Sequence, residues 1–252
     1  MTRVAAEIRI GDLVKTFGLA PSALTVIDGV SFEAAPNEFV AVVGPSGCGK
    51  STILRLVAGL ERPDGGAVTI EGTEPDPRRH RIGFVFQGDS LLPWRTIEQN
   101  IALGLENAAV TATERHSRAR GLVGLVGLEG FERYFPYQVS GGMRQRAAVA
   151  RAFAIDPEVL LMDEPFGSLD VQMRKALQIE LLRVWERLKT TVLFVTHDVE
   201  EAVILADRIV VLTPRPAHIS DVIGVPLARP RDPLAADFLE IRRRLEGLLH
   251  GD

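Results

Sequence analysis

Residues 44–52 read Gly44-Pro45-Ser46-Gly47-Cys48-Gly49-Lys50-Ser51-Thr52, and an apolar, strand-like run at 38–43 leads directly into them. A strand, a glycine-rich turn and a helix together form the framework of a phosphate-binding loop, because glycines let successive backbone N–H groups curl around an anion. Lys50 would bring a positive charge to the outer phosphates, and the Ser51 hydroxyl would be placed to hold Mg²⁺. The alternative is an ordinary glycine-rich turn.

Composition limits the classes of protein that need considering. The chain has 252 residues, of which 46% are hydrophobic and 25% charged, enough to bury the core of one large domain or two joined lobes. A net charge of −4 and a pI of about 5.8 argue against a nucleic-acid binder held by bulk electrostatics. No apolar run approaches the roughly 18–20 residues of a membrane span, and the N-terminal segment lacks the apolar stretch of a secretory signal. We therefore expect a soluble, cytoplasmic protein.

Cys48 is the only cysteine, so an internal disulfide is excluded and a reducing compartment is favoured. Two interpretations of this residue remain open. It is either a small, buried filler of the loop or a reactive thiol beside the phosphates.

Alternating or clustered apolar and β-branched residues predict two groups of strands. We expect the first group to form an antiparallel sheet; its segments are 6–10, 26–33 and 67–70. The second group should be parallel, because a helix predicted over 171–189 connects two of its strands; its segments are 38–43, 82–86, 159–162, 191–195 and 208–212. Further helices are predicted over 50–59, 96–107, 112–128, 141–155 and 233–249.

The expected architecture is a single α/β domain over 1–252. Residues 1–87 and 156–220 would form the α/β core with its antiparallel part. Residues 88–155 would form an inserted helical subdomain, and 221–252 a C-terminal helical tail. We expect the amphipathic tail to pack against the body rather than bind a membrane, despite its run Arg242-Arg243-Arg244.

Nucleotide hydrolysis requires a second contact to Mg²⁺ and a group that positions or deprotonates water. Asp163 and Glu164 follow four apolar residues, so they lie at the carboxyl end of a buried strand, where open α/β sheets place their ligands. Asp163 would reach the metal and Glu164 is the candidate general base. A solvated acidic pair at a strand end is the alternative.

His197 and Gln87 also follow predicted strands. His197 would contact the terminal phosphate or the attacking water, and Gln87 would bind metal or water. A lone histidine is more often a polar structural residue, and Gln87 alone is an equally weak signal.

A second anion-binding turn is predicted at Ser140-Gly141-Gly142, where a helix begins. Ser140 can cap the helix, and the paired glycines leave room for an anion. No lysine accompanies this turn, so it is half of a site. A half-site of this kind makes sense if it completes the nucleotide site of another subunit.

These motifs resemble those of the nucleotide-binding subunit of ATP-binding cassette (ABC) transporters, over nearly the whole chain. Residues 44–52 resemble the Walker A loop, 140–146 the signature motif and 159–164 the Walker B strand with its catalytic glutamate. Further matches are Gln87 to the Q-loop, Ser168-Leu169-Asp170 to the D-loop and His197 to the switch histidine. The signature begins with Val139 where the family usually has leucine.

The resemblance implies a P-loop NTPase core that hydrolyses Mg-ATP. It also implies a head-to-tail homodimer, in which each ATP lies between the Walker A loop of one subunit and the signature motif of the other. Phe17 would stack on adenine where the family commonly has tyrosine, unless it is a core residue.

Residues 91–96 and 143–146 look like those of importers of nitrate, sulfonate and taurine. The family implies a peripheral subunit on the cytoplasmic side of the membrane, with a permease bound in a groove near Gln87 and Trp94. Trp94 would line that groove or else be a buried core residue. A separate solute-binding protein would take part indirectly, and the sequence does not identify the solute.

Three other functions fit the sequence less well. An ABC ATPase that acts on DNA or ribosomes usually has a coiled-coil insertion or two cassettes. A small-molecule kinase would not need residues 140–146. An ABC exporter usually has membrane helices fused to the cassette.

Overall fold

The computed structural model describes residues 5–18, 22–88, 90–106, 110–167 and 169–250. The chain divides into two compact units. One comprises residues 81–190, and the other comprises 5–80 together with 191–252. Within the described ranges, no helix is long and apolar enough to cross a membrane.

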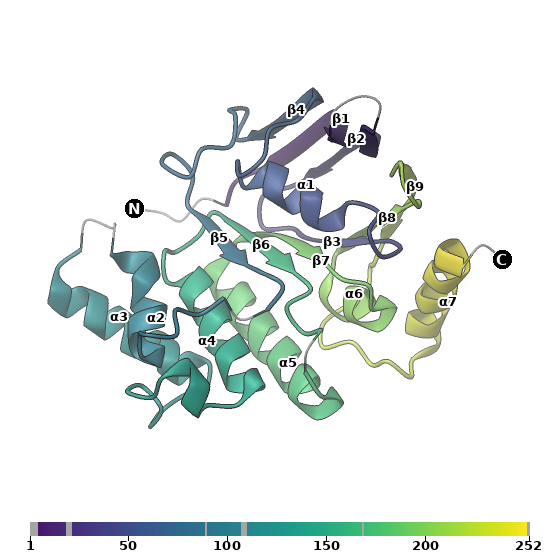
Figure 1. The fold of residues 1–252 in the computed structure, drawn as a ribbon. Helices are drawn as coiled ribbons and strands as arrows, with labels where there is room; N and C mark the ends of the chain where they lie inside the picture. Colours follow the sequence, from purple (N-terminus) through teal and green to yellow (C-terminus); the bar gives the residue numbers. More distant parts are fainter. Residues whose placement is uncertain (1–4, 19–21, 89, 107–109, 168, 251–252) are drawn as a thin grey trace. The chain divides into compact units, whose positions relative to one another are not determined.

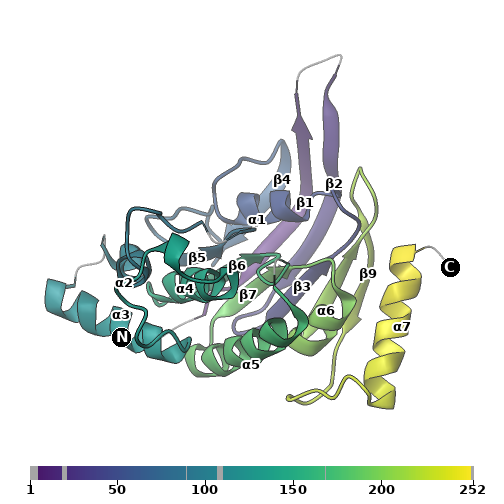
Figure 2. The same ribbon diagram turned by 60° about the horizontal axis from the view of Figure 1, so that its bottom comes forward.

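The unit of residues 5–80 and 191–252 contains the predicted antiparallel sheet. Its strands lie in the order β2 (Leu24–Ala34), β1 (Ile8–Phe17) and β4 (Gly65–Ile70), and both pairings are antiparallel. Figure 2 shows β1 and β2 as long neighbouring strands. They extend beyond the predicted segments because bulges interrupt the ladder between them without ending it.

The same unit contains the phosphate-loop strand, β3 (Phe39–Val43), between β7 (Thr191–Val195) and β8 (Arg208–Leu212). Both pairings are parallel, as predicted. All five residues of β3 and all five of β7 are buried, which explains their continuous apolar sequences. Helix α1 (Lys50–Val57) follows β3.

Two elements of this unit were not predicted. Strand β9 (Ile219–Gly224) pairs antiparallel with β8, and α6 (Val199–Leu205) connects β7 to β8. The tail forms α7 (Ala236–His250), which packs on α6 (Figure 1). Its Phe238 and Leu245 are completely buried. The expected packing of the tail against the body is thereby confirmed.

The unit of residues 81–190 pairs β5 (Ile82–Val85) with β6 (Val159–Asp163), again in parallel. Its helices are α2 (Ile97–Ala102), α3 (Ala112–Leu125), α4 (Gly141–Phe153) and α5 (Val171–Leu188), with short 3₁₀ turns at Leu103–Leu105 and Pro136–Gln138. Apolar residues of α2, α3 and α4 form one buried cluster. The predicted helices over 96–107 and 112–128 therefore exist, although both end earlier than expected.

Asn100 organises the loop that precedes α2. Its side chain is fully buried, accepts a hydrogen bond from Leu92 N at 2.7 Å, and donates to the carbonyl oxygens of Leu92, Arg95 and Thr96 at 3.0–3.1 Å. These four bonds hold the loop around Trp94, whose own side chain is 70% exposed. This exposure rules out the alternative in which Trp94 is a buried core residue.

Replacing Asn100 with alanine should lower the free energy of unfolding by roughly 2–4 kcal/mol, because buried backbone groups would lose their partners. Urea unfolding followed by circular dichroism measures the loss. Gln99→Ala is the control: among the described residues, the Gln99 side chain accepts only the capping bond from Thr96 N, so a loss below about 1 kcal/mol is expected. Equal losses in the two variants would contradict the role given to Asn100.

Candidate functional site

The phosphate loop has the backbone that its glycines predicted. Gly47 and Gly49 have φ angles of +74° and +114°, in the left-handed region that favours glycine. A Cβ at Gly49 would lie 2.8 Å from Val26 Cγ1, so no larger residue fits there. Helix α1 begins after Gly49 without a side-chain cap and without an acidic residue in its first turn. This helix end can therefore receive an anion.

Lys50 lies in the hollow of this loop. Its ammonium group donates to the carbonyl oxygens of Gly44 at 2.8 Å and Pro45 at 3.0 Å, and the residue is 5% exposed. Ser46 and Gly47 form the exposed rim, and Ser51 and Thr52 lie partly exposed in the first turn of α1. The loop thus presents a fixed positive charge beside a helix N-terminus, which suits a phosphate group.

Cys48 is buried, with 1% exposure. Burial raises the pKa of its thiol, and the nearby positive charges of Lys50 and Arg215 offset this only in part. The thiol is therefore protonated and covered at neutral pH, which favours the filler interpretation over a reactive thiol.

His197 leaves the sheet at the same edge as the phosphate loop. The parallel register pairs Val42 with Val195, and Thr196 N donates to Val42 O at 3.3 Å. His197 itself is exposed. The next residue, Asp198, caps α6 by accepting bonds from the backbone N–H groups of Glu200 and Glu201.

Phe17 lies at the end of β1 and is 38% exposed, which favours a stacking surface over the core alternative. Sequence reasoning missed Lys15, whose ammonium lies 5.3 Å from the centre of the Phe17 ring. The ammonium also donates to Arg62 O at 2.8 Å. Residues two apart along a strand lie on the same face, so the spacing of Lys15 and Phe17 was the signal that could have revealed this pair.

Arg215 was also missed. Its guanidinium Cζ lies 3.9 Å from the place that a Cβ of Gly47 would occupy. It is exposed and makes no hydrogen bond or ion pair among the described residues. β8 ends beside β3 in the same direction, so the loop after β8 reaches the phosphate loop. Only the strand order, which the sequence did not reveal, places this cation there.

Residues 81–190 bring together a second group of the predicted residues. Gln87 follows β5, Asp163 ends β6 and Glu164 comes next. Gln87 Nε2 donates to Glu164 Oε2 at 3.5 Å, a long hydrogen bond, and Asp163 is 6% exposed. Glu164 has a φ angle of +44°, a strained conformation for a residue other than glycine.

The predicted half-site begins α4. Ser140 caps the helix, as expected, by accepting a bond from Met143 N at 3.3 Å. The two glycines differ in surroundings. A Cβ at Gly142 would lie 3.0 Å from Met173 Cγ of α5, whereas at Gly141 the nearest atom is Arg144 Nη2 at 3.7 Å. A side chain at position 142 would therefore crowd Met173 of α5, whereas the position of Gly141 is open.

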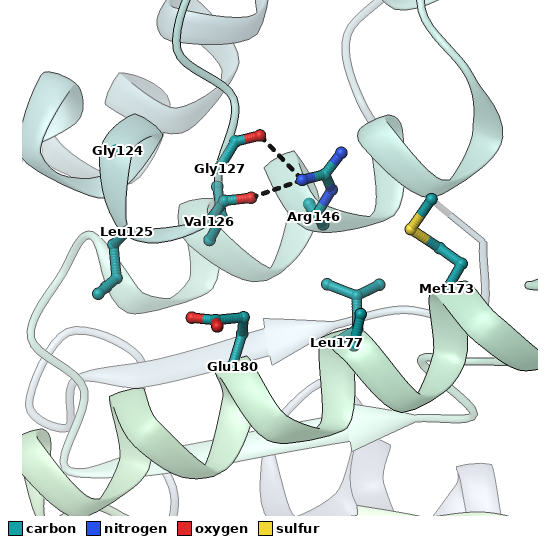
Figure 3. Close-up of a pocket in the computed structure, with 9 residues that line it drawn as sticks. Gly124, Leu125, Val126, Gly127, Arg146, Met173, Leu177 and Glu180 are labelled. Carbon is teal, nitrogen blue, oxygen red and sulfur yellow. Dashed lines mark hydrogen bonds between the residues drawn. The ribbon is translucent and has the colours of Figure 1, made fainter.

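Arg146, further along α4, closes the end of α3. Its Nη1 donates to the carbonyl oxygens of Val126 at 3.0 Å and Gly127 at 2.8 Å (Figure 3). Burial lowers the pKa of the guanidinium. The pocket beside it, about 280 Å³, is lined by the end of α3, α4 and α5. Arg146, a residue of the predicted signature motif, therefore has a structural role.

Ser168 of the expected D-loop lies outside the described residues.

The two units thus each present predicted site residues after the carboxyl ends of parallel strands. The profile of the ABC transporter family matches residues 27–167. An uncharacterised ABC transporter ATP-binding protein of Methanocaldococcus jannaschii, MJ0412, is 46% identical over 98% of this chain and 92% of its own length. The chain belongs to the ABC transporter family. The aliphatic sulfonates import ATP-binding protein SsuB of Bacillus cereus is 42% identical over 94% of both chains.

Solved ABC cassettes share the fold. The dimeric, post-hydrolysis structure of the ATP-binding cassette MJ0796 bound to ADP and Pi superposes with a TM-score of 0.78, at 31% identity, over 88% of this chain and 100% of that one. A second dimeric MJ0796 structure gives a TM-score of 0.77 at 32% identity. The predicted fold class is confirmed, and this member of the ABC family is an ATPase.

Alkylation tests the environment of Cys48. N-ethylmaleimide should modify the native chain much more slowly than free cysteine at pH 7, because the thiol is covered and its pKa is raised. The rate should keep rising above about pH 8.5, where the rate for an exposed thiol levels off. Mass spectrometry counts the adduct, since the chain has one cysteine. Modification as fast as that of free cysteine would contradict this assignment.

Proposed function

We propose that the chain is the ATP-hydrolysing subunit of an importer for an alkanesulfonate or a related small solute such as taurine or nitrate. The observation that carries the proposal is the 42% identity to SsuB over 94% of both chains. The subunit would act at the cytoplasmic face of the membrane, bound to a permease, with a separate solute-binding protein choosing the cargo.

Each predicted residue has a role in this proposal. Lys50 and the amides of residues 44–52 hold the phosphates, and Phe17 stacks on adenine. Ser51, Asp163 and Gln87 hold Mg²⁺, and their hydroxyl, carboxylate and amide oxygens are the ligands that this ion prefers. The ion would neutralise charge on the phosphates. Glu164 accepts the proton of the attacking water, and His197 contacts the terminal phosphate or that water.

Dimerisation completes the site. Ser140, Gly141 and Gly142 would meet the nucleotide held by the Walker A loop of a second copy, in a head-to-tail arrangement. The dimeric state of the solved MJ0796 cassettes supports this. ATP binding would close the dimer, and hydrolysis would reset the permease.

The division into a core of 1–87 and 156–220, a helical subdomain of 88–155 and a tail of 221–252 belongs to the same proposal.

Glu164→Gln should lower kcat for ATP hydrolysis by about 10²–10⁴-fold while sparing ATP binding, because the amide cannot take a proton from water. The variant should accumulate as an ATP-bound dimer in size-exclusion chromatography with Mg-ATP. Glu186→Gln changes an exposed carboxylate on α5 and is the matched control. A Glu164→Gln chain that stays monomeric and hydrolyses ATP normally would refute this role.

The importer proposal predicts that the tagged chain co-purifies with a membrane protein that spans the bilayer several times. Trp94→Ala should reduce the yield of that complex, since the exposed indole would be buried by the permease. Tyr137→Ala, which removes an equally exposed aromatic ring, is the control. The reconstituted complex would then be tested with binding protein loaded with alkanesulfonate, taurine or nitrate. Recovery of ribosomes or DNA instead of a permease would favour the non-transport alternative.

A further inference from the structure

The segment after β9 carries two arginines that reach back to the C-terminal end of α6. Arg231 Nη1 donates to the carbonyl oxygens of Val203 at 2.6 Å, Ile204 at 3.4 Å and Ala206 at 2.6 Å. Arg229 Nη2 donates to the remaining carbonyl of this turn, that of Leu205, at 2.5 Å. All four carbonyls at the end of α6 are therefore bound by guanidinium groups that come from a distant part of the chain.

The chemistry of a helix end explains these contacts. The last four carbonyls of a helix have no partner within it, and they carry the negative end of the helix dipole. A planar guanidinium with five N–H donors can serve several of them at once. Burial lowers the pKa of Arg231 to about 10, so it remains charged at neutral pH.

Arg231 also ties this helix end to its own segment. Its Nε donates to Leu227 O at 3.0 Å, and its Nη2 to Val225 O at 3.1 Å. Arg229 forms an ion pair with Asp207 at 2.7 Å, and Asp207 accepts a bond from Phe39 N, where the phosphate-loop strand begins. The end of α6 is therefore fixed both to the segment 225–231 and, through Asp207, to β3.

The other end of α6 carries the loop of His197. Asp198 caps the first turn, and the Thr196 hydroxyl donates to the buried carboxylate of Glu201 at 2.7 Å. From α7, Arg242 reaches Glu200 in the same turn at 3.4 Å. Since α6 has seven residues, it is only about 10 Å long. In so short a helix, a shift or tilt at the C-terminal end also moves the first turn, which follows His197.

We infer that Arg231 is a positioning residue: by fixing the C-terminal end of α6 it sets, through this short helix, the place of His197. The inference rests on the proposed role of His197 in hydrolysis. A plain capping role would need only one or two carbonyl contacts, such as a terminal lysine or a glycine turn commonly supplies. Arg231 instead makes five contacts that join the helix to a segment 25 residues further along the chain.

A double-mutant cycle tests the inference. The rate of ATP hydrolysis is measured as single-turnover phosphate release, which can be followed even in slow variants. Arg231→Met keeps the aliphatic bulk and removes the donors. We expect it to lower the rate of hydrolysis about tenfold, a size typical for a small misplacement of a functional group. ATP affinity should change less than about twofold, because the contacts of Lys50 are untouched. The same substitution should have no further effect in a His197→Ala background, because both changes act on one group.

Arg243→Met is the matched control, since Arg243 is exposed on α7 and makes no hydrogen bond or ion pair in the described part of the chain. It should leave the rate unchanged. If Arg231→Met does not fold, Arg231→Lys takes its place. Lysine keeps the positive charge but has fewer donors than the planar guanidinium, so it should show a smaller loss, about twofold, that also vanishes in the His197→Ala background.

The possible outcomes separate the positioning role of Arg231 from the role proposed for His197 in hydrolysis. Equal losses in both backgrounds would mean a general structural defect and would overturn the positioning role. No loss in Arg231→Met, with a clear loss in His197→Ala, would overturn the inference and leave the proposed function intact. A His197→Ala chain that hydrolyses ATP normally would overturn the role of His197, and the inference with it.

Discussion

Parallel pairing of β3 with β7 and β8 is the constraint on which the phosphate loop and its neighbours depend. Val42 pairs with Val195 and Val43 with Val211, so the three strands end together. The loops that follow them carry Lys50, His197 and Arg215. A slip of one residue would move a loop by about 3.3 Å, more than a hydrogen bond tolerates. Burial of every residue in β3 and β7 prevents such a slip.

The fold was predictable wherever a single segment carried a clear hydrophobic pattern or a helix-capping residue. The apolar runs of β3, β6 and β7 predicted buried parallel strands, and Ser140 predicted the start of α4. Helix α6 has only seven residues, fewer than the window in which helical periodicity can be recognised. Strand β9 buries only one of its six residues, so its alternation was too weak to detect.

Arginine has a structural use here that the sequence did not suggest. Only four of the 29 basic residues are lysines. Arg146 binds the two carbonyls after α3, and Arg231 with Arg229 binds those of α6. Each arrangement joins residues that are about 20 or more positions apart, so no local pattern reveals it. The same distance explains why Arg215 was missed while Lys50, inside a compact motif, was found.

The backbone at Glu164 is strained, and the proposed role of its side chain offers a reason for that strain. A φ angle of +44° is strained for a residue other than glycine, and the following Pro165 restricts the backbone further. Glycine would relieve the strain, and the bond from Gly167 N to Glu164 O would survive because it uses only the backbone. The carboxylate beside Gln87 would be lost. A strained glutamate at this position fits the catalytic role proposed for its carboxylate, because backbone strain of this kind occurs at functional sites.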